Sequence, residues 1–184
     1  MAAARLFVAL VPPATVQAEL AALAVPLPGV RWTPADNLHL TLRFIGDTEP
    51  DKQAALEMAL ARVRVEPFIL PVGGLGVFPT RGPAKVLWAG VGRGHTRLYQ
   101  LRKQVDESLL SVDTALDVHS FHPHFTLGRL GEEHVAKALA KFIEHHPGFE
   151  APPFRVDTFH LMANELTMGR PQAYRTVRSF PLEG

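Results

Sequence analysis

The chain contains one sequence pattern twice, and this repeat constrains the fold more than any other feature. HLTLRFIGD at residues 39–47 aligns without a gap on HFTLGRLGE at residues 124–132. His, Thr, Leu and Gly match, an acidic residue follows each Gly, and a segment of helical character follows each copy. Self-similarity at one fixed separation predicts a duplicated half-domain rather than a short-period solenoid.

Each copy of the repeat predicts a β-strand, at residues 38–45 and 121–130. In the first strand apolar and polar residues alternate, so His39, Thr41 and Arg43 are expected on one face, and two leucines and a Phe on the other. Residues two apart on a strand lie about 6.5–7 Å from each other on one face. Each copy would therefore present an imidazole and a hydroxyl to the same place.

Strands and helices are also predicted around the two copies. Further strands are expected at residues 5–11, 67–78, 85–91, 154–163 and 173–182, with a bulge or bend in the glycine-broken second of these. Helices are expected after Pro12-Pro13, from residue 47 to about 65, from Gly94, and from residue 132 to near Pro147. Strands and helices thus follow one another in the same order in both halves.

Composition narrows the class of protein. The 184 residues are enough for one domain or two small lobes that share a core, and the absence of Cys rules out disulfides and thiolate metal sites. The first apolar run is too short for a membrane span or a good signal peptide, so we expect a cytoplasmic protein without membrane attachment. A net charge of +1 gives no long-range attraction for nucleic acid, so any such substrate would be held locally.

Two imidazoles and two hydroxyls converging on one place favour a particular chemistry. Histidine titrates near neutral pH, so one ring can remove a proton while the other delivers one. Threonine hydroxyls can donate to the equatorial oxygens of a phosphoryl group. The combination indicates in-line attack at phosphorus without a metal, and a cyclic 2′,3′-phosphate is the natural substrate because its strained ring already contains the leaving alkoxide.

The paired motifs, in the forms HxTLxFxG and HxTLxR, resemble those of the two-histidine (2H) phosphoesterases. Within that superfamily the chain most resembles the RNA 2′,3′-cyclic phosphodiesterases, also called 2′-5′ RNA ligases. The resemblance extends from RLFVAL near the start to YRTVRSFPL near the end. It implies an α+β fold in a single bilobal domain over residues 1–184, with pseudo-twofold symmetry, two antiparallel-rich sheets facing a central cleft, and helices outside.

The resemblance also implies a reaction and the residues that perform it. The reaction is metal-independent hydrolysis of RNA-terminal 2′,3′-cyclic phosphate to a 2′-phosphomonoester, linked to reversible 2′-5′ joining of RNA ends. His39 and His124 would be the acid and the base, with His124 favoured as base, and Thr41 and Thr126 would bind the phosphate. The expected partners are RNA ends or nucleoside 2′,3′-cyclic phosphates, with no cofactor, and the expected state is a monomer.

Four further residues are candidates for substrate binding. Arg129 matches an arginine common in the family but has the wrong strand parity, which a bulge at Gly128 would correct. Arg43 has the right parity for a phosphate or RNA-backbone contact, the alternative being a surface ion pair. Phe7 would lie near the base or pack in the core, and Trp32 could stack on a nucleobase.

Two other functions remain open at this point. The same cleft could belong to an RNA-binding module that holds a phosphorylated end without reaction, which predicts tight, salt-dependent binding and no product. A metal-dependent hydrolase could use His39, His122 and His124, since a H-x-H pair on a strand can grip a metal. Loss of activity in chelator would identify this last class.

Overall fold

The structure is a computed structural model that describes residues 4–92, 95–115, 117, 120–131, 136–165 and 173–184. The elements in chain order are β1 (Ala4–Leu10), α1 (Ala14–Ala22), β2 (Val30–Trp32), a short 3-10 helix η1 (Ala35–Asn37), β3 (Leu40–Thr48), α2 (Pro50–Leu60), β4 (Phe68–Phe78), β5 (Val86–Val91), α3 (Thr96–Leu110), β6 (His124–Leu130), α4 (Ala136–Glu144), β7 (Glu150–Val156), β8 (Thr158–Glu165) and β9 (Ala173–Pro181).

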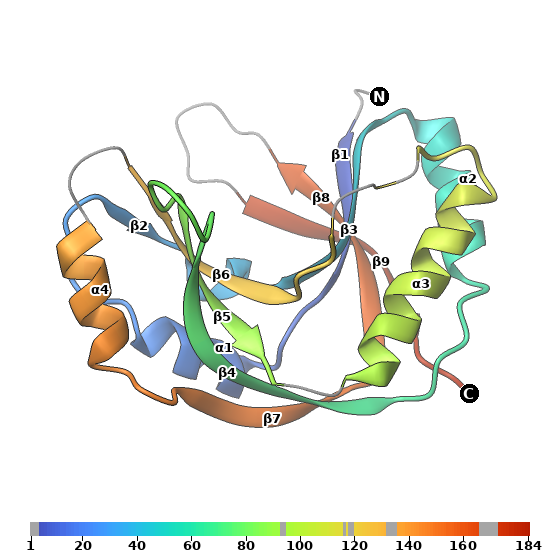
Figure 1. Cartoon of the computed structure of the whole chain (residues 1–184). Coiled ribbons are helices and arrows are strands. Elements are labelled where there is room, and N and C mark those ends of the chain that lie inside the picture. The colour runs from blue at the N-terminus through green and yellow to red at the C-terminus, as the bar shows by residue number, and fades with distance from the viewer. Residues whose placement is uncertain (1–3, 93–94, 116, 118–119, 132–135, 166–172) are drawn as a thin grey trace.

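The strands form one antiparallel sheet in the order β7-β4-β5-β6-β3-β1-β8-β9, with β2 paired to β6. The sheet is strongly curled, with α2 and α3 on one side and α1 and α4 on the other (Figure 1). Its two halves meet in the middle, where β3 and β6 pair through Leu40 and Phe125. The predicted α+β fold is confirmed, and the two expected sheets are the halves of this one sheet.

The two halves repeat the same unit. In the first half β1, α1, β3 and α2 follow one another, and β1 pairs with β3; in the second, β5, α3, β6 and α4 follow one another, and β5 pairs with β6. The two motif strands are the innermost pair of the sheet. The duplication seen in the sequence therefore brings the two copies of the motif side by side.

The core lies on the face of the sheet opposite the motif His and Thr residues. Leu40, Leu42 and Phe125 are fully buried and Leu127 is 2% exposed, within one apolar cluster that spans both halves. Burying each such side chain contributes about 1.5–3 kcal/mol to folding. This burial fixes which face of β3 and β6 turns away from the core.

Several elements differ from their predicted bounds: the motif strands begin at Leu40 and His124 rather than at residues 38 and 121, and β3 continues to Thr48. The expected strand at residues 154–163 is two strands, because β7 pairs with β4 at one edge of the sheet whereas β8 pairs with β1 in the other half. The chain crosses between the halves at Asp157, and Pro152 and Pro153 are tolerated because β7 is an edge strand. Helix α2 begins with Pro50 in its first turn and ends at Leu60, short of residue 65.

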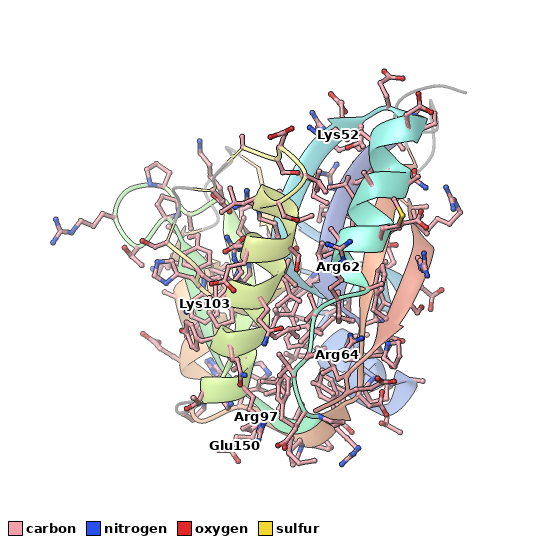
Figure 2. All side chains as sticks on the ribbon, turned by 90° about the vertical axis from the view of Figure 1, so that its right-hand side faces the viewer. Lys52, Arg62, Arg64, Arg97, Lys103 and Glu150 are labelled. Carbon is pink, nitrogen blue, oxygen red and sulfur yellow. The ribbon has the colours of Figure 1, made fainter. Side chains whose placement is uncertain are left out.

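The helices α2 and α3 lie side by side on the outside of the first half. Figure 2 shows basic side chains spread over this outer face, among them Lys52, Arg62, Arg64 and Lys103. Among the described residues, no helix is long and apolar enough to cross a membrane.

Candidate active site

The pairing of β3 with β6 interleaves the two motifs. Leu40 lies opposite Phe125 in an antiparallel register. This is the one pair that joins the two strands within the described residues, and extending its register by one residue in each direction aligns His39 with Thr126 and Thr41 with His124. All four side chains share the face that points away from the core, so each imidazole has the hydroxyl of the other copy as its neighbour.

A β-bulge in the second motif turns Arg129 to the same face. Between Thr126 and Gly128, strand β6 contains an extra residue, Leu127, that has no counterpart in the paired strand β5. An extra residue shifts the alternation of the strand beyond it. Arg129, which an ideal strand would turn to the face opposite His124, therefore lies on the same face, as the glycine in the sequence suggested.

The first motif has a bulge at the equivalent position. Between Thr41 and Arg43, strand β3 contains an extra residue, Leu42, that has no counterpart in the paired strand β1. Strict alternation along this strand, as predicted from the sequence, is therefore wrong beyond Thr41. Arg43 turns to the buried face, and Phe44 turns to the face of the motif residues, where it is 70% exposed.

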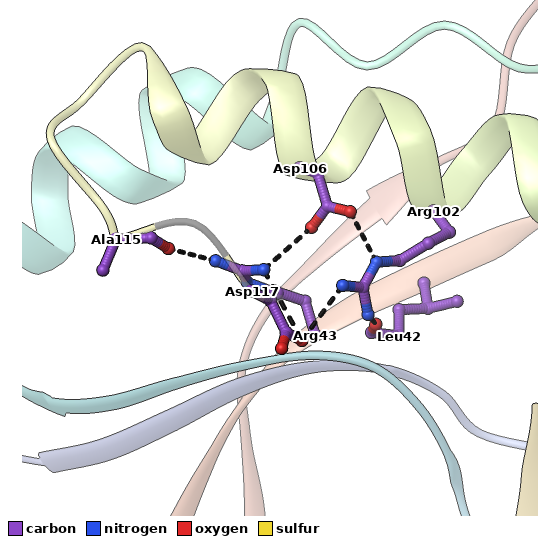
Figure 3. Close-up of polar contacts among 6 residues, drawn as sticks. All are labelled: Leu42, Arg43, Arg102, Asp106, Ala115 and Asp117. Atoms are coloured by element: carbon purple, nitrogen blue, oxygen red, sulfur yellow. Dashed lines mark hydrogen bonds and ion pairs between the residues drawn. The ribbon is translucent and has the colours of Figure 1, made fainter. Parts of the chain in front are cut away.

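The prediction that Arg43 contacts phosphate is wrong, because its guanidinium is buried in an ion-pair network (Figure 3). Nη1 of Arg43 lies 3.3 Å from Asp106 and 3.5 Å from Asp117, and Nη2 donates to the carbonyl of Ala115. Arg102 joins both carboxylates, at 2.6 Å and 3.1 Å, and donates to the carbonyl of Leu42. The network ties the bulge of β3 to α3 and to the segment that leads to the second motif.

The ring of His39 is oriented by the backbone. Nδ1 donates to the carbonyl of Asn37 at 2.7 Å, so Nε2 is the nitrogen left for acid-base chemistry. The imidazole packs against Phe7 and Tyr174, with ring centroids 5.0 Å and 4.8 Å away. These contacts hold the ring on three sides.

His124 is oriented in the same way. Its Nδ1 donates to the carbonyl of His122 at 2.6 Å, again two residues earlier in the chain. Its ring packs edge-on against Phe78, with centroids 5.0 Å apart, and lies 6.4 Å from the ring of Trp88. Both histidines therefore present Nε2, and each has its own aromatic support.

Burial lowers the pKa of both imidazoles. For His39 the hydrogen bond to Asn37 opposes this shift in part, whereas the positive charges of His124 and Arg129 add to it. For His124 burial is again the largest cause, and His122 lowers the pKa further.

Arg129 also reaches the last strand. It hydrogen-bonds to the hydroxyl of Tyr174 and so opposes the rise in the pKa of Tyr174 that burial causes. Because Tyr174 packs edge-on against His39, the arginine and the imidazole share one neighbour. This contact places a permanent positive charge at the site.

Phe7 and Trp32 both pack against other side chains. Phe7 is 3% exposed and supports the ring of His39, which agrees with the core-packing interpretation. Trp32 lies opposite Gly128 in β2, on the face opposite Arg129. Its indole N–H donates to the carbonyl of Val25 at 2.8 Å and its ring packs against Phe142, so it has no place in the cluster around the motif residues.

Two exposed residues of the site were not singled out from the sequence. Arg31 lies directly opposite Arg129 across the β2/β6 pair, and both line a cavity of about 390 Å³. Phe44 lies near Phe7, with ring centroids 6.2 Å apart. Phe44 could have been identified from the sequence, because it occupies the same position as Arg129 when the two copies of the repeat are aligned.

Among the described residues, no group of three or more His, Asp or Glu side chains is arranged to hold a metal ion. His39 and His124 instead each use one nitrogen to bond a backbone carbonyl. The arrangement places two imidazoles, two hydroxyls and a guanidinium on one face of the sheet. Such a set can stabilise and protonate an oxyanion that forms at a central atom.

Known proteins with similar sequences and folds are nucleic-acid enzymes. The family model described as the 2′-5′ RNA ligase superfamily matches residues 12–167. An RNA 2′,3′-cyclic phosphodiesterase of Aeropyrum pernix is 34% identical over 142 residues, which are 77% of this chain and 80% of that protein. One of Escherichia coli is 30% identical over 90% of both chains. A crystal structure of E. coli LigT complexed with 3′-AMP superposes with a TM-score of 0.79 at 26% identity, over 98% of each chain.

Proposed function

The chain belongs to the 2′-5′ RNA ligase superfamily, and we propose that it hydrolyses RNA-terminal 2′,3′-cyclic phosphate to a 2′-phosphomonoester. The observation that carries this proposal is the interleaved pairing of the two motifs about Leu40 and Phe125. The names of similar enzymes in A. pernix and E. coli support the same substrate class.

In the proposed reaction the two imidazoles act in opposite senses. His124 takes a proton from a water molecule as its oxygen bonds to phosphorus, and the bond from phosphorus to O3′ breaks. His39 gives its proton to O3′. The phosphate is left on O2′, one proton has moved onto His124, one has left His39, and exchange with solvent restores both rings.

The surroundings of the two rings support this choice of base and acid. His124 lines an open cavity of about 780 Å³, which gives an attacking molecule room to approach. His39 is enclosed by Phe7 and Tyr174, which favours a fixed contact with a leaving oxygen. The base must reach a mobile nucleophile, whereas the acid must reach an atom already held by the substrate.

The remaining groups stabilise charge on the phosphoryl oxygens. Thr41 and Thr126 supply hydroxyl donors from neighbouring strands, and Arg129 supplies a positive charge. Donors that are held in place before the reaction contribute most where charge develops during it. Phe7 positions the ring of His39 and makes no contact with substrate in this scheme.

The same site supports 2′-5′ joining of RNA ends. A 5′-hydroxyl that replaces water as the nucleophile would form a 2′-5′ phosphodiester with the same movement of protons. The reverse reaction would cleave such a bond and close the cyclic phosphate again.

The proposal is tested by incubating the purified protein with nucleoside 2′,3′-cyclic phosphates in the presence of chelator. We expect the 2′-monophosphate as the product. Formation of the 3′-monophosphate would refute the proposed leaving group. Tight binding of the RNA end without any product would instead identify the binding-module function, and activity only without chelator would identify a metal-dependent hydrolase.

A further inference from the structure

The cavity beside His124 extends the site into the second half of the sheet. It holds about 780 Å³, within the usual size of small-molecule sites. Among the described residues its lining includes His124 but not His39. The side chains that form most of its walls are those of Phe78, Trp88, His95, Tyr99 and His122.

Two glycines let the indole of Trp88 form a broad wall of this cavity. Gly76 lies directly opposite Trp88 in the β4/β5 pair, and Gly90 lies two residues further along the strand. A Cβ atom would come within 2.2 Å of the indole Cζ2 at Gly76, and within 3.1 Å of Cζ3 at Gly90. The ring therefore lies across backbone that carries no side chains, and Phe78 flanks it with its ring centroid 5.2 Å away.

The aromatic wall of the cavity suits a flat aromatic ligand. The rings of Trp88 and Phe78 lie at an interplanar angle of 32°, and Tyr99, which is 52% exposed, lines the same cavity. Nucleobases stack on aromatic side chains whatever their identity, because every base has a π-face. A nucleobase therefore fits this wall.

In-line displacement assigns opposite sides of phosphorus to the attacking and leaving oxygens. If the nucleoside with the cyclic phosphate directs O3′ to His39, the attacking group approaches from the side of His124, where this cavity opens. We propose that the cavity is the subsite for the nucleoside whose 5′-hydroxyl attacks, that is, for the 5′ end of a second RNA. The inference rests on the proposed function and adds the acceptor to it.

The step in this subsite is balanced without any further reactant. The 5′-oxygen bonds to phosphorus, the bond from phosphorus to O3′ breaks, the 5′-hydroxyl proton moves to His124, and His39 protonates O3′. The product is a 2′-5′ phosphodiester with one nucleoside on each side of phosphorus. The complete site should therefore hold two joined nucleosides more tightly than one.

The test measures binding by calorimetry, with a ligand that cannot react. A 2′-5′-linked dinucleoside monophosphate whose first sugar lacks the 3′-hydroxyl cannot close to a cyclic phosphate, and the 2′-nucleoside monophosphate is the matched ligand without the second nucleoside. We expect the dinucleotide to bind wild-type protein about 5- to 150-fold more tightly, the range for stacking one base on an aromatic side chain. Tyr99→Ala should remove most of this difference and leave the affinity for the 2′-monophosphate unchanged. Trp88→Leu should lower the affinity for the dinucleotide more than the affinity for the 2′-monophosphate.

Leu110→Ala is the control, because Leu110 is 43% exposed on the same helix as Tyr99, which is 52% exposed. It should alter neither affinity. Tyr99→Ala also guards against misfolding of the Trp88 variant, since an exposed side chain is removed. Equal affinity of the two ligands for wild-type protein would overturn the subsite, as would equal losses for both ligands in the variants. Hydrolysis of a nucleoside 2′,3′-cyclic phosphate, assayed in parallel, reports separately on the proposed function.

Discussion

Phe44 and Arg129 occupy equivalent positions in the two halves of the sheet, each two residues beyond a leucine that forms a β-bulge. The bulges at Leu42 and Leu127 turn both side chains to the face of the motif histidines. The site is thus nearly symmetric in its imidazoles and hydroxyls but has an aromatic ring on one side and a guanidinium on the other. This difference gives a nearly symmetric site the means to hold an asymmetric substrate in one orientation.

Replacing either motif histidine should abolish most of the activity. We expect His39→Ala and His124→Ala each to reduce turnover of a 2′,3′-cyclic nucleotide by about 10²- to 10⁴-fold, the usual contribution of one proton-transfer group. His145→Ala is the control, because His145 is exposed beyond α4 and donates a hydrogen bond to the carbonyl of Lys141 in the same segment. Near-normal turnover in either motif variant, with folding checked by circular dichroism, would refute the acid-base assignment.

Removing the charge of Arg129 should slow the reaction more than it weakens folding. We expect Arg129→Gln to reduce kcat by about 10²- to 10³-fold, the cost of losing one donor to a developing oxyanion. Arg62→Gln makes the same change on the outer face formed by α2 and α3 (Figure 2) and should have no effect. Steady-state kinetics with a cyclic mononucleotide measures both, and equal rates for the two variants would remove Arg129 from the mechanism.

Arg43 should behave as a structural residue. Arg43→Met removes a guanidinium partner from the carboxylates of Asp106 and Asp117, and we expect a loss of about 3–5 kcal/mol in the free energy of unfolding. Arg5→Gln, which breaks the exposed pair with Asp47 on the neighbouring strand, should cost only about 0–1 kcal/mol. Denaturant titration gives both values; a stable Arg43 variant that has lost its activity would mean that the guanidinium acts on substrate after all.

Arg31 should contribute to binding of RNA rather than of mononucleotides. It lies opposite Arg129, and like charges facing each other across a strand pair are unfavourable unless an anion lies between or near them. We expect Arg31→Gln to reduce the affinity for an RNA 3′ end with several phosphates and to flatten its dependence on salt by about one charge. The KM for a nucleoside 2′,3′-cyclic phosphate should stay the same; a parallel rise in that KM would place Arg31 at the reacting phosphate.

The lowered pKa values of the site histidines should shift the activity profile towards acid. One ring must be neutral and the other protonated, and burial lowers the pKa of both below the ordinary 6.5. We expect a bell-shaped pH profile of kcat/KM with its maximum below pH 6.5. The maximum of the kcat profile should lie at higher pH, because a bound phosphate anion stabilises the protonated ring and so raises its pKa. A maximum of kcat/KM above pH 7 would contradict the burial of the free site.

The same burial predicts how folding depends on pH. Burial also lowers the pKa of His160. The unfolded chain binds protons at these three rings near pH 6.5, whereas the folded chain binds them only at lower pH, so stability is full above pH 6.5 and falls as the pH drops below it. Denaturant midpoints at pH 7.5 and 5.5 measure the loss. His39→Ala should lose less than wild type over this interval, and an equal loss in both would show that His39 does not contribute.

The repeat in the sequence was enough to predict the fold class and the face of the motif strands that is buried, because both follow from strand alternation and from burial of one face. The bulge before Arg129 was predictable from Gly128, a residue that permits it. No glycine signals the bulge before Arg43, so its burial could not be foreseen. β7 and β8 separate at Asp157 because they pair with different strands that are far away in the chain. A local sequence pattern cannot predict such pairing.

The orientation of Trp32 is another feature that the local sequence pattern could not predict. Its face of β2 is set by pairing with Gly128, and β2 spans only Val30–Trp32, too short for its own alternation to be read. Trp88 and its two glycines could have been noticed as an aromatic residue among small ones. Only the pairing of β4 with β5 reveals that Gly76 and Trp88 face each other.

The pairing of Leu40 with Phe125 also fixes the register of β3 and β6 relative to each other. If β3 slid by a single residue against its neighbours, its leucines would turn to water, and His39 and Thr41 would turn into the interior. The free-energy cost of exposing those leucines therefore maintains the register that aligns an imidazole of one half with a hydroxyl of the other. The packing of the interior and the arrangement of the polar groups therefore depend on the same pair of residues.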